Sequence, residues 1–422
     1  MKAITQNKLF KDSFWAILGN GLGSALMLAS GILIARMLGK DLYGEYGIVK
    51  STMVYAASFA SFGLSVTSTR FVAQAIKENS SCVKSVIRNI IGVASCFSLV
   101  IAILLFALAH PLAIYLGTGD LTMPLRVMSV IMIARAVNFT ATGILGGLGE
   151  FRKLAINNVI AGAYMLAACI PLTRSFSLGG ALGALLSYQI VNSALNLNAI
   201  RVVTALLPGQ VNFNNFKELI SQSFPIALRD SSYVICNWVA ILMLSKMADM
   251  GELGVYTAAT QWSAIITCIP GLLNNVVLSH LSATYDQKTR NMKTVRTMLV
   301  VYLSSTSFLF LLVAIFSRPI ASMYGTTFDT LVPVLRLIIF ATIPDCCSEV
   351  FQSEFVALGR NWFLFSARLV KDTLLLLSVY LLLSAFNGNN GAYYFAIASL
   401  AASFVYFVVL ILSYLITEKK RI

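Results

Sequence analysis

Apolar runs of helical length recur from end to end of this chain and constrain its fold more than any other feature. Charged or turn-rich breaks divide them into twelve runs, and no strand-like alternation competes with them. A helix crosses a bilayer with about 20 mostly apolar residues, and its backbone groups are satisfied internally. The sequence therefore predicts an all-α polytopic membrane protein. The twelve predicted spans are centred on Leu26, Ala57, Ser98, Ala136, Ala163, Ile190, Ile235, Ile266, Phe308, Pro344, Leu375 and Val405.

Composition agrees with this class. The 422 residues are 58% hydrophobic and 11% charged, whereas a soluble domain is about 45–50% apolar and about 25% charged. The net charge of +14 does not indicate nucleic acid, because the basic residues fall between the apolar runs. The seven cysteines are scattered without metal-ligand spacing, and there is no phosphate-binding loop or His/Glu metal motif. We expect no metal, no cofactor and no nucleic-acid partner.

The basic residues predict the orientation. With a cytoplasmic N-terminus, 19 of the 31 Lys and Arg residues lie on the cytoplasmic side, 5 lie on the opposite side and 7 lie within spans. Under the positive-inside rule both termini are cytoplasmic, which requires an even number of spans. The first run, residues 14–35, is longer than the ~7–15 apolar residues of a signal peptide, so we keep it as a span.

The two halves of the chain repeat each other. Four matches occur in order at offsets of 208 to 210 residues: Gly44 and Tyr46 with Gly254 and Tyr256, Pro111 with Pro319, Arg126 with Arg336, and Gly149 with Gly359. An offset of six spans preserves orientation. The repeat predicts two six-helix lobes, residues 1–208 and 216–422, joined by a cytoplasmic linker at 209–215 and related by a pseudo-twofold axis along the membrane normal.

Charged residues inside the spans are the candidate functional residues. A charge at membrane depth costs at least ~2.5–3.5 kcal/mol, so such side chains usually face protein or water. Arg229 and Asp230 lie inside the apolar stretch 224–247, which opens the second half. Either the two neutralise each other and lock two helices together, or they line a polar cavity between two halves of a transporter. The other candidates are the cations Lys50, Arg135, Arg368 and Lys371 and the acids Asp345, Glu349 and Asp372.

Spacing separates these candidates further. Arg368 and Asp372 are four residues apart, which suits an ion pair within one helix, whereas Lys50 and Arg135 have no acid within one helical turn in the sequence. In the repeat, the acids Asp345 and Glu349 correspond to Arg135 and Phe139 of the first half. Arg126 and Arg336 lie about one turn from the outer ends of their spans, where they are expected to reach the surface.

Three short motifs carry a resemblance to a known family: ARMLG at residues 35–39, YGEY at 43–46 and GLGEF at 147–151. With the chain length and the repeat, they resemble the multidrug/oligosaccharidyl-lipid/polysaccharide exporter superfamily, and within it the bacterial polysaccharide flippases, O-antigen translocases of the Wzx type. The resemblance covers the whole chain. It implies a two-lobed inner-membrane exporter that moves undecaprenyl-pyrophosphate-linked sugar units from the inner to the outer leaflet, without catalytic residues.

The resemblance also gives the charges a role. We expect Lys50, Arg135, Arg229, Arg368 and Lys371 to line a space between the lobes and to bind the pyrophosphate, which prefers Arg and Lys partners. Coupling to H⁺ or Na⁺ would use the acids, namely Asp230, Asp345, Glu349 and Asp372.

Two alternatives stay open. A multidrug exporter of the same superfamily would need an acid-dominated pocket. A membrane glycosyltransferase or polysaccharide polymerase usually carries a larger extramembrane loop than this chain offers. A polysaccharide polymerase and a chain-length regulator are also possible partners of a flippase.

Overall fold

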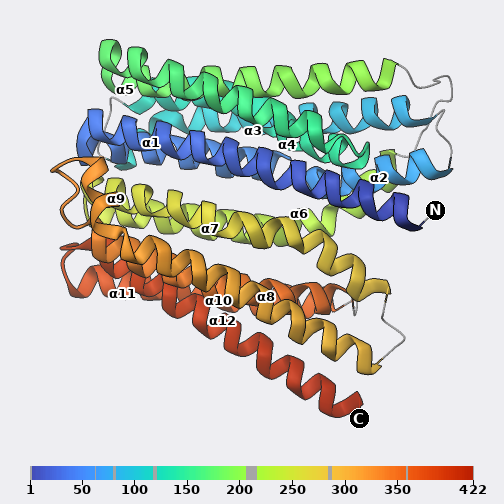
Figure 1. Ribbon diagram of the computed structural model, residues 1–422. Helices are drawn as coiled ribbons and strands as arrows, with labels where there is room; N and C mark the ends of the chain where they lie inside the picture. Colours follow the sequence, from blue (N-terminus) through green and yellow to red (C-terminus); the bar gives the residue numbers. More distant parts are fainter. Residues whose placement is uncertain are drawn as a thin grey trace. The chain divides into compact units, whose positions relative to one another are not determined.

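The computed structural model of the protein is helical throughout the part that it describes, residues 2–61, 63–78, 82–116, 121–205, 216–283, 288–357 and 360–421 (Figure 1). The helices are α1 (Lys2–Ala60), α2 (Leu64–Glu78), α3 (Val83–Leu116), α4 (Thr122–Gly147), α5 (Phe151–Ala205), α6 (Phe216–Met247), α7 (Met250–Ala283), α8 (Lys288–Ile315), α9 (Ser317–Tyr324), α10 (Leu331–Ala357), α11 (Asn361–Ala385) and α12 (Gly391–Arg421).

Every predicted span centre lies in a helix, but helices and predicted spans do not correspond one to one. Helix α1 carries the first two predicted spans and α5 carries the fifth and sixth, whereas α2 and α9 are short helices between spans. In the described residues, seven helices are long and apolar enough to cross a membrane. The all-α, multi-pass fold class is confirmed, and the number of twelve crossings stays a prediction.

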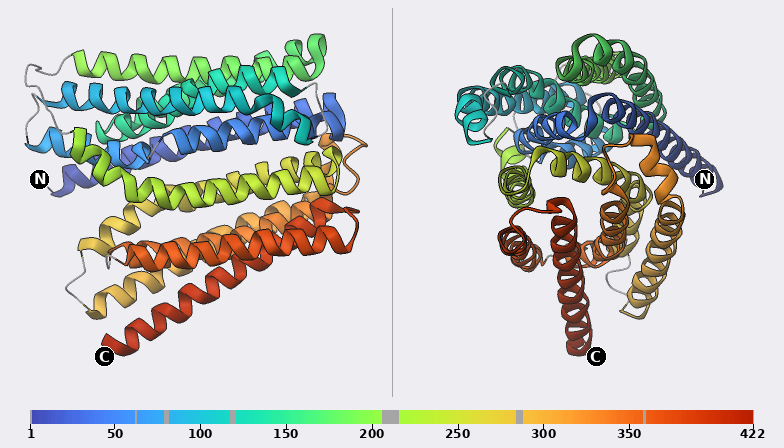
Figure 2. Two further views of the ribbon diagram at one scale, coloured as in Figure 1. Left: turned by 180° about the vertical axis from the view of Figure 1, so that it is seen from behind. Right: turned by 90° about the vertical axis from the view of Figure 1, so that its left-hand side faces the viewer.

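Both long helices contain a break in the backbone, which is where two predicted spans meet. Gly39 in α1 has φ 74° and ψ 172°, a conformation essentially restricted to glycine. In α5 the break falls at Phe176 and Ser177, and Ser177 has φ 48°. A Cβ at Gly180 would overlap the carbonyl oxygen of Leu172, so the chain turns back on itself there and the two segments of α5 run side by side (Figure 2).

The chain forms two compact units: residues 1–30 with 45–238, and residues 31–44 with 239–422. They divide the chain differently from the predicted lobes. One reason is that residues 31–44, which include the end of the first predicted span and the residues after it, pack with residues of the second half. The lobes at 1–208 and 216–422 stay a prediction, and the predicted linker at 209–215 lies outside the described residues.

Each unit has its own apolar core. In the first unit α2, α3, α4 and α5 pack together around residues such as Val72, Ile90 and Ile144. In the second unit α7, α8, α10, α11 and α12 pack together, and the buried side chains include Tyr302 and Phe355. Large apolar side chains on α3, α8, α11 and α12 remain exposed, as expected for helices that face lipid.

A reciprocal contact in the second unit joins the two sequence repeats. A Cβ at Gly44 would overlap the carbonyl oxygen of Met250, and a Cβ at Gly254 would overlap the carbonyl oxygen of Lys40. Lys40 and Met250 are 210 residues apart, as are Gly44 and Gly254, so each contact is the counterpart of the other in the repeat. Small residues allow such close approach of helices in membranes.

Candidate functional site

Lys50 of α1 and Arg135 of α4 lie close together in the first unit. Arg135 Nη1 donates a hydrogen bond to Gln189 Oε1 at 3.3 Å, and the guanidinium carbon lies 4.6 Å from the centroid of the Phe139 ring. Lys50 Nζ lies 5.8 Å from the centroid of the Tyr46 ring. The two positive charges are near enough to repel each other. The structure thus brings together two of the five predicted cations.

These two cations are not balanced by a nearby acid. Among the side chains that the structure describes, no carboxylate lies within 4.0 Å of Lys50 or Arg135. In addition, Arg135 Nε is buried without a hydrogen-bond partner. Holding two like charges together at low dielectric is unfavourable unless a counter-charge arrives. The arrangement is therefore suited to an anionic ligand with more than one charge.

A network of buried amides extends along α4 and α5 beyond Gln189. Asn196 Nδ2 donates to Asn138 Oδ1 at 2.7 Å and to Asn192 Oδ1 at 3.3 Å, and Asn157 Nδ2 donates to Asn196 Oδ1 at 2.8 Å. All four asparagines are buried. The sequence analysis missed this network because these side chains carry no charge. The network could have been predicted from the spacing of Gln189, Asn192 and Asn196, which places three amides on one helix face.

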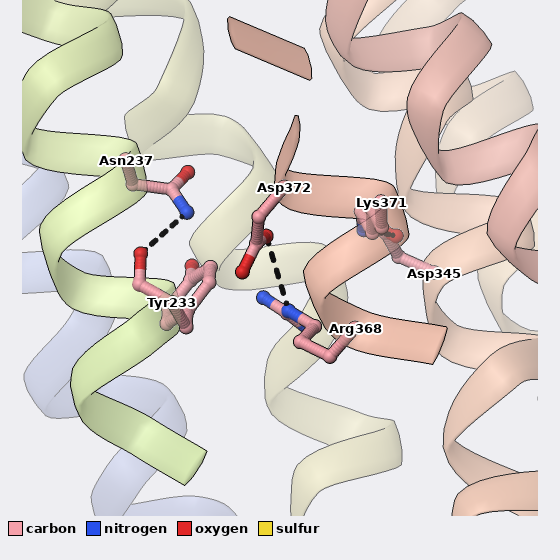
Figure 3. Close-up of polar contacts among 6 residues, drawn as sticks. All are labelled: Tyr233, Asn237, Asp345, Arg368, Lys371 and Asp372. Carbon is pink, nitrogen blue, oxygen red and sulfur yellow. Dashed lines mark hydrogen bonds and ion pairs between the residues drawn. The ribbon is translucent and has the colours of Figure 1, made fainter. Parts of the chain in front are cut away.

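The second unit pairs its cations with acids. Arg368 Nε lies 3.3 Å from Asp372 Oδ1 within α11, and Lys371 Nζ lies 2.5 Å from Asp345 Oδ1 of α10 (Figure 3). Both cations also approach the ring of Tyr406, at 5.9 Å for Arg368 and 5.4 Å for Lys371. The Arg368–Asp372 pair is the one that the spacing predicts, whereas the Lys371–Asp345 pair joins two helices.

Further acids accompany these pairs on α10. Glu349 lies one turn after Asp345, and its Oε2 is buried without a hydrogen-bond partner. Tyr302 of α8 is close enough to interact with it electrostatically. Glu354 is only 1% exposed, and the sequence analysis did not select it. In α10 and α11 of the second unit, acids therefore outnumber the cations at the site.

Helix α6 carries two of the predicted site residues. Arg229 and Asp230 belong to α6, but their side chains lie outside the described residues. Further along this helix, Asn237 Nδ2 donates to the backbone oxygen of Tyr233 at 2.8 Å (Figure 3). Trp238 Nε1 donates to Thr52 Oγ1 at 3.1 Å, which fixes an aromatic ring against the helical turn of α1 that carries Lys50.

In the described part of the chain, no group of three or more His, Cys, Asp or Glu side chains is arranged to hold a metal ion. The charged residues instead form two groups. Lys50 and Arg135 lie in the first unit, and Arg368 and Lys371 lie with their acids in the second.

Comparison with known proteins finds relatives that are named for polysaccharide biosynthesis and export. Residues 9–280 match the family described as polysaccharide biosynthesis protein. The chain is 25% identical over 269 residues to the succinoglycan biosynthesis transport protein ExoT of Rhizobium meliloti strain 1021, covering 63% of this chain and 50% of that one. It is 23% identical over 394 residues to the EPS I polysaccharide export inner membrane protein EpsE of Ralstonia solanacearum, covering 86% and 85%. The chain thus spans half the length of ExoT and most of EpsE.

A solved structure shares the fold. This is a multidrug resistance MATE family transporter of the MOP superfamily, in an inward-facing conformation, with a TM-score of 0.76 over 96% of this chain and 99% of that one. The sequence identity is 14%, so this similarity concerns the fold alone.

Proposed function

Because the chain belongs to the polysaccharide biosynthesis protein family, we propose that it is a flippase for an undecaprenyl-pyrophosphate-linked oligosaccharide, such as an O-antigen repeat unit. It moves this lipid-linked sugar from the inner to the outer leaflet of the bacterial inner membrane by alternating access. The names of the two relatives, a biosynthesis transport protein and an inner-membrane export protein, support this class of substrate. The transport and export roles in these names favour a transporter over an enzyme.

One observation carries the proposal: Lys50 and Arg135 lie together with no described carboxylate in reach. A pyrophosphate has two or more negative charges and, once dehydrated, needs cationic partners that donate hydrogen bonds. Arg135 supplies a planar fork for bidentate binding and Lys50 supplies a point charge. Gln189 holds one Nη of the guanidinium and so positions it.

The same observation weighs against the multidrug alternative. Exporters of cationic drugs need acids at the binding site, and the first unit places two cations there. The glycosyltransferase or polymerase alternative is disfavoured because both relatives are named for transport or export.

In this proposal the second unit couples transport to an ion gradient. Asp345 and Asp372 hold Lys371 and Arg368 in ion pairs. If H⁺ or Na⁺ neutralises these acids, the paired cations become available to the substrate. Glu349 of the second unit and Asp230, which belongs to the first, are further candidates for binding the ion. Arg229, Arg368 and Lys371 then join Lys50 and Arg135 as pyrophosphate ligands. Ion binding and substrate binding are thereby linked through shared charges.

The proposed topology has twelve crossings, both termini in the cytoplasm and two lobes related by a pseudo-twofold axis. The reciprocal contact of Gly44 and Gly254 with Met250 and Lys40 supports the twofold relation. A polysaccharide polymerase and a chain-length regulator are the partners that would take up the exported unit.

The test is export of polysaccharide by cells whose only copy of the protein carries a substitution. Arg135→Ala should reduce surface polysaccharide to background at normal membrane abundance, and Arg135→Lys should restore part of it because lysine lacks the fork. The matched control is Arg126→Ala, on the same helix near the Phe106 ring, which should export normally. Normal export by Arg135→Ala would refute the proposal.

A further inference from the structure

Aromatic rings and amides gather in the turn between α11 and α12, within a segment that carries no charged residue. Figure 1 shows where these two helices lie. Residues 373–417 contain no Lys, Arg, Asp, Glu or His. At the turn, the rings of Phe386 and Tyr394 are stacked, with centroids 4.0 Å apart and planes 8° apart. Tyr393 meets Tyr394 edge-on at 5.7 Å. Phe386 is 44% exposed and Tyr393 is 36% exposed, so the aromatic group is partly open.

Three asparagines surround these rings and leave their side-chain amides unused. Asn387, Asn389 and Asn390 are exposed, and in the part of the chain that the structure describes their amides form no hydrogen bond. Each amide offers two donors and one acceptor oxygen. Flat apolar rings beside free amides match a ligand that has an apolar C–H face and many hydroxyl groups.

The backbone presents these groups in a fixed geometry. Of three non-glycine residues with positive φ in the described chain, two lie here, Asn387 at 49° and Asn390 at 50°. Asparagine is one of the few side chains that tolerates this region. The backbone N–H groups of Tyr393 and Tyr394 both donate to the backbone carbonyl oxygen of Asn390, at 3.0 and 3.2 Å.

The base of the turn is anchored within the second unit. A Cβ at Gly388 would overlap the carbonyl oxygen of Met247, so the backbone packs directly on the end of α6. The Ala392 N–H donates to Glu252 Oε2 of α7 at 2.7 Å. Anchoring removes the entropy cost of ordering the turn when a ligand binds, which is the benefit of a preorganised site.

We propose that this turn, residues 386–394, is a binding platform for a neutral saccharide. One face of a pyranose ring packs on Phe386 and Tyr393, and the sugar hydroxyls bond to the amides of Asn387, Asn389 and Asn390. Because the segment carries no charge, the proposed ligand is the sugar and not the pyrophosphate, which needs cationic partners. The location on the extracytoplasmic side rests on the proposed function and its orientation, where the platform would receive the sugar part of the exported lipid.

Anchoring of aromatic rings in the membrane interface is the competing role, since such rings are common there. The substitution Phe386→Leu separates the two roles because leucine keeps the apolar side chain and removes the flat ring. Asn389→Ala removes an amide at a position without positive φ. The matched control is Phe316→Leu, an exposed phenylalanine of the same unit at the start of α9.

The experiment is saturation-transfer NMR and calorimetry on the full chain in lipid nanodiscs, with methyl glycosides of glucose, galactose and N-acetylglucosamine as probes. The wild type and Phe316→Leu should bind at least one glycoside equally, and Phe386→Leu and Asn389→Ala should weaken it by roughly 3–10-fold. No binding to the wild type, or equal binding to Phe386→Leu, would overturn the platform. Arg135→Ala should keep glycoside binding, so a failure of the flippase proposal and a failure of this inference are distinguishable.

Discussion

Arg135 in the first unit and Asp345 in the second correspond to each other in the sequence repeat but carry opposite charges. Arg135 packs on Phe139 and bonds to a neutral amide, and its neighbour is a second cation, Lys50. Asp345 pairs with Lys371 and is followed one turn later by Glu349. The helices of the two repeats are alike, whereas the charged residues that they carry differ. The first unit is suited to an anion and the second to a cation.

The largest effect on export is expected when Arg135 of the first unit is replaced by the acid found at the corresponding position of the second unit. Arg135→Asp places a carboxylate beside Lys50, where an ion pair can form, and removes the anion site. We expect surface polysaccharide to fall to background while thermal stability in detergent is unchanged or higher. Arg126→Asp on the same helix is the control and should export. Export by Arg135→Asp would show that the opposite charges of the two units have no role.

Removing a cation of the second unit should destabilise the protein. Arg368→Ala leaves the carboxylate of Asp372, which is 1% exposed, without its ion-pair partner. Breaking a buried pair costs about 3–5 kcal/mol, and because 19% of the Arg368 side chain is exposed we expect about 2–3 kcal/mol. Thermal unfolding of the purified protein measures this loss, and Arg368→Ala with Asp372→Asn should recover most of it. An unchanged melting temperature would contradict the pairing.

The amide network of the first unit should contribute less. Asn196→Leu removes hydrogen bonds to three other asparagines. Side-chain hydrogen bonds between membrane helices average about 0.6 kcal/mol and reach about 1.7, so the expected loss is about 1–2 kcal/mol. Asn198→Leu, at an exposed position of the same helix, is the control in the same unfolding assay. If Asn196→Leu lost more free energy of unfolding than Arg368→Ala, the predicted order of the two effects would be wrong.

The smallest change in stability is expected for Lys50→Met. No described carboxylate depends on Lys50, and its removal relieves repulsion with Arg135. The melting temperature should therefore stay the same or rise slightly, in contrast to Arg368→Ala, although export should fall. A destabilisation as large as that of Arg368→Ala would mean that Lys50 has a structural acid partner after all.

The sequence was sufficient for the helical class and for part of the site. Apolar runs placed every span centre in a helix, since length and hydropathy alone decide which segments can enter lipid. The Arg368–Asp372 pair was predictable because both residues lie on one helix face. Lys50 and Arg135 stood out because the sequence near them offers no acid.

Other features depend on tertiary structure. Lys371 and Asp345 are 26 residues apart on different helices, so no local pattern reveals their pairing. The amide network carries no charge and hardly changes the hydropathy of the helices. Three of its residues, Gln189, Asn192 and Asn196, nevertheless share one helix face. Residues 31–44 belong to the second unit, in which the backbones of Gly44 and Gly254 approach Met250 and Lys40 closely. A sequence alone does not disclose such contacts.

We expect the unbalanced cations of the first unit to bind pyrophosphate. The balanced cations of the second unit do not bind it as long as their acids are ionised. The direct test is the binding of undecaprenyl pyrophosphate to the purified protein in nanodiscs at neutral pH, for the wild type, Arg135→Ala and Arg368→Ala. We predict that Arg135→Ala weakens binding by roughly 10-fold or more, the ~1.5–3 kcal/mol of a charged hydrogen bond, and that Arg368→Ala binds like the wild type. Equal binding by the wild type and Arg135→Ala, or an equal loss in both variants, would contradict the account.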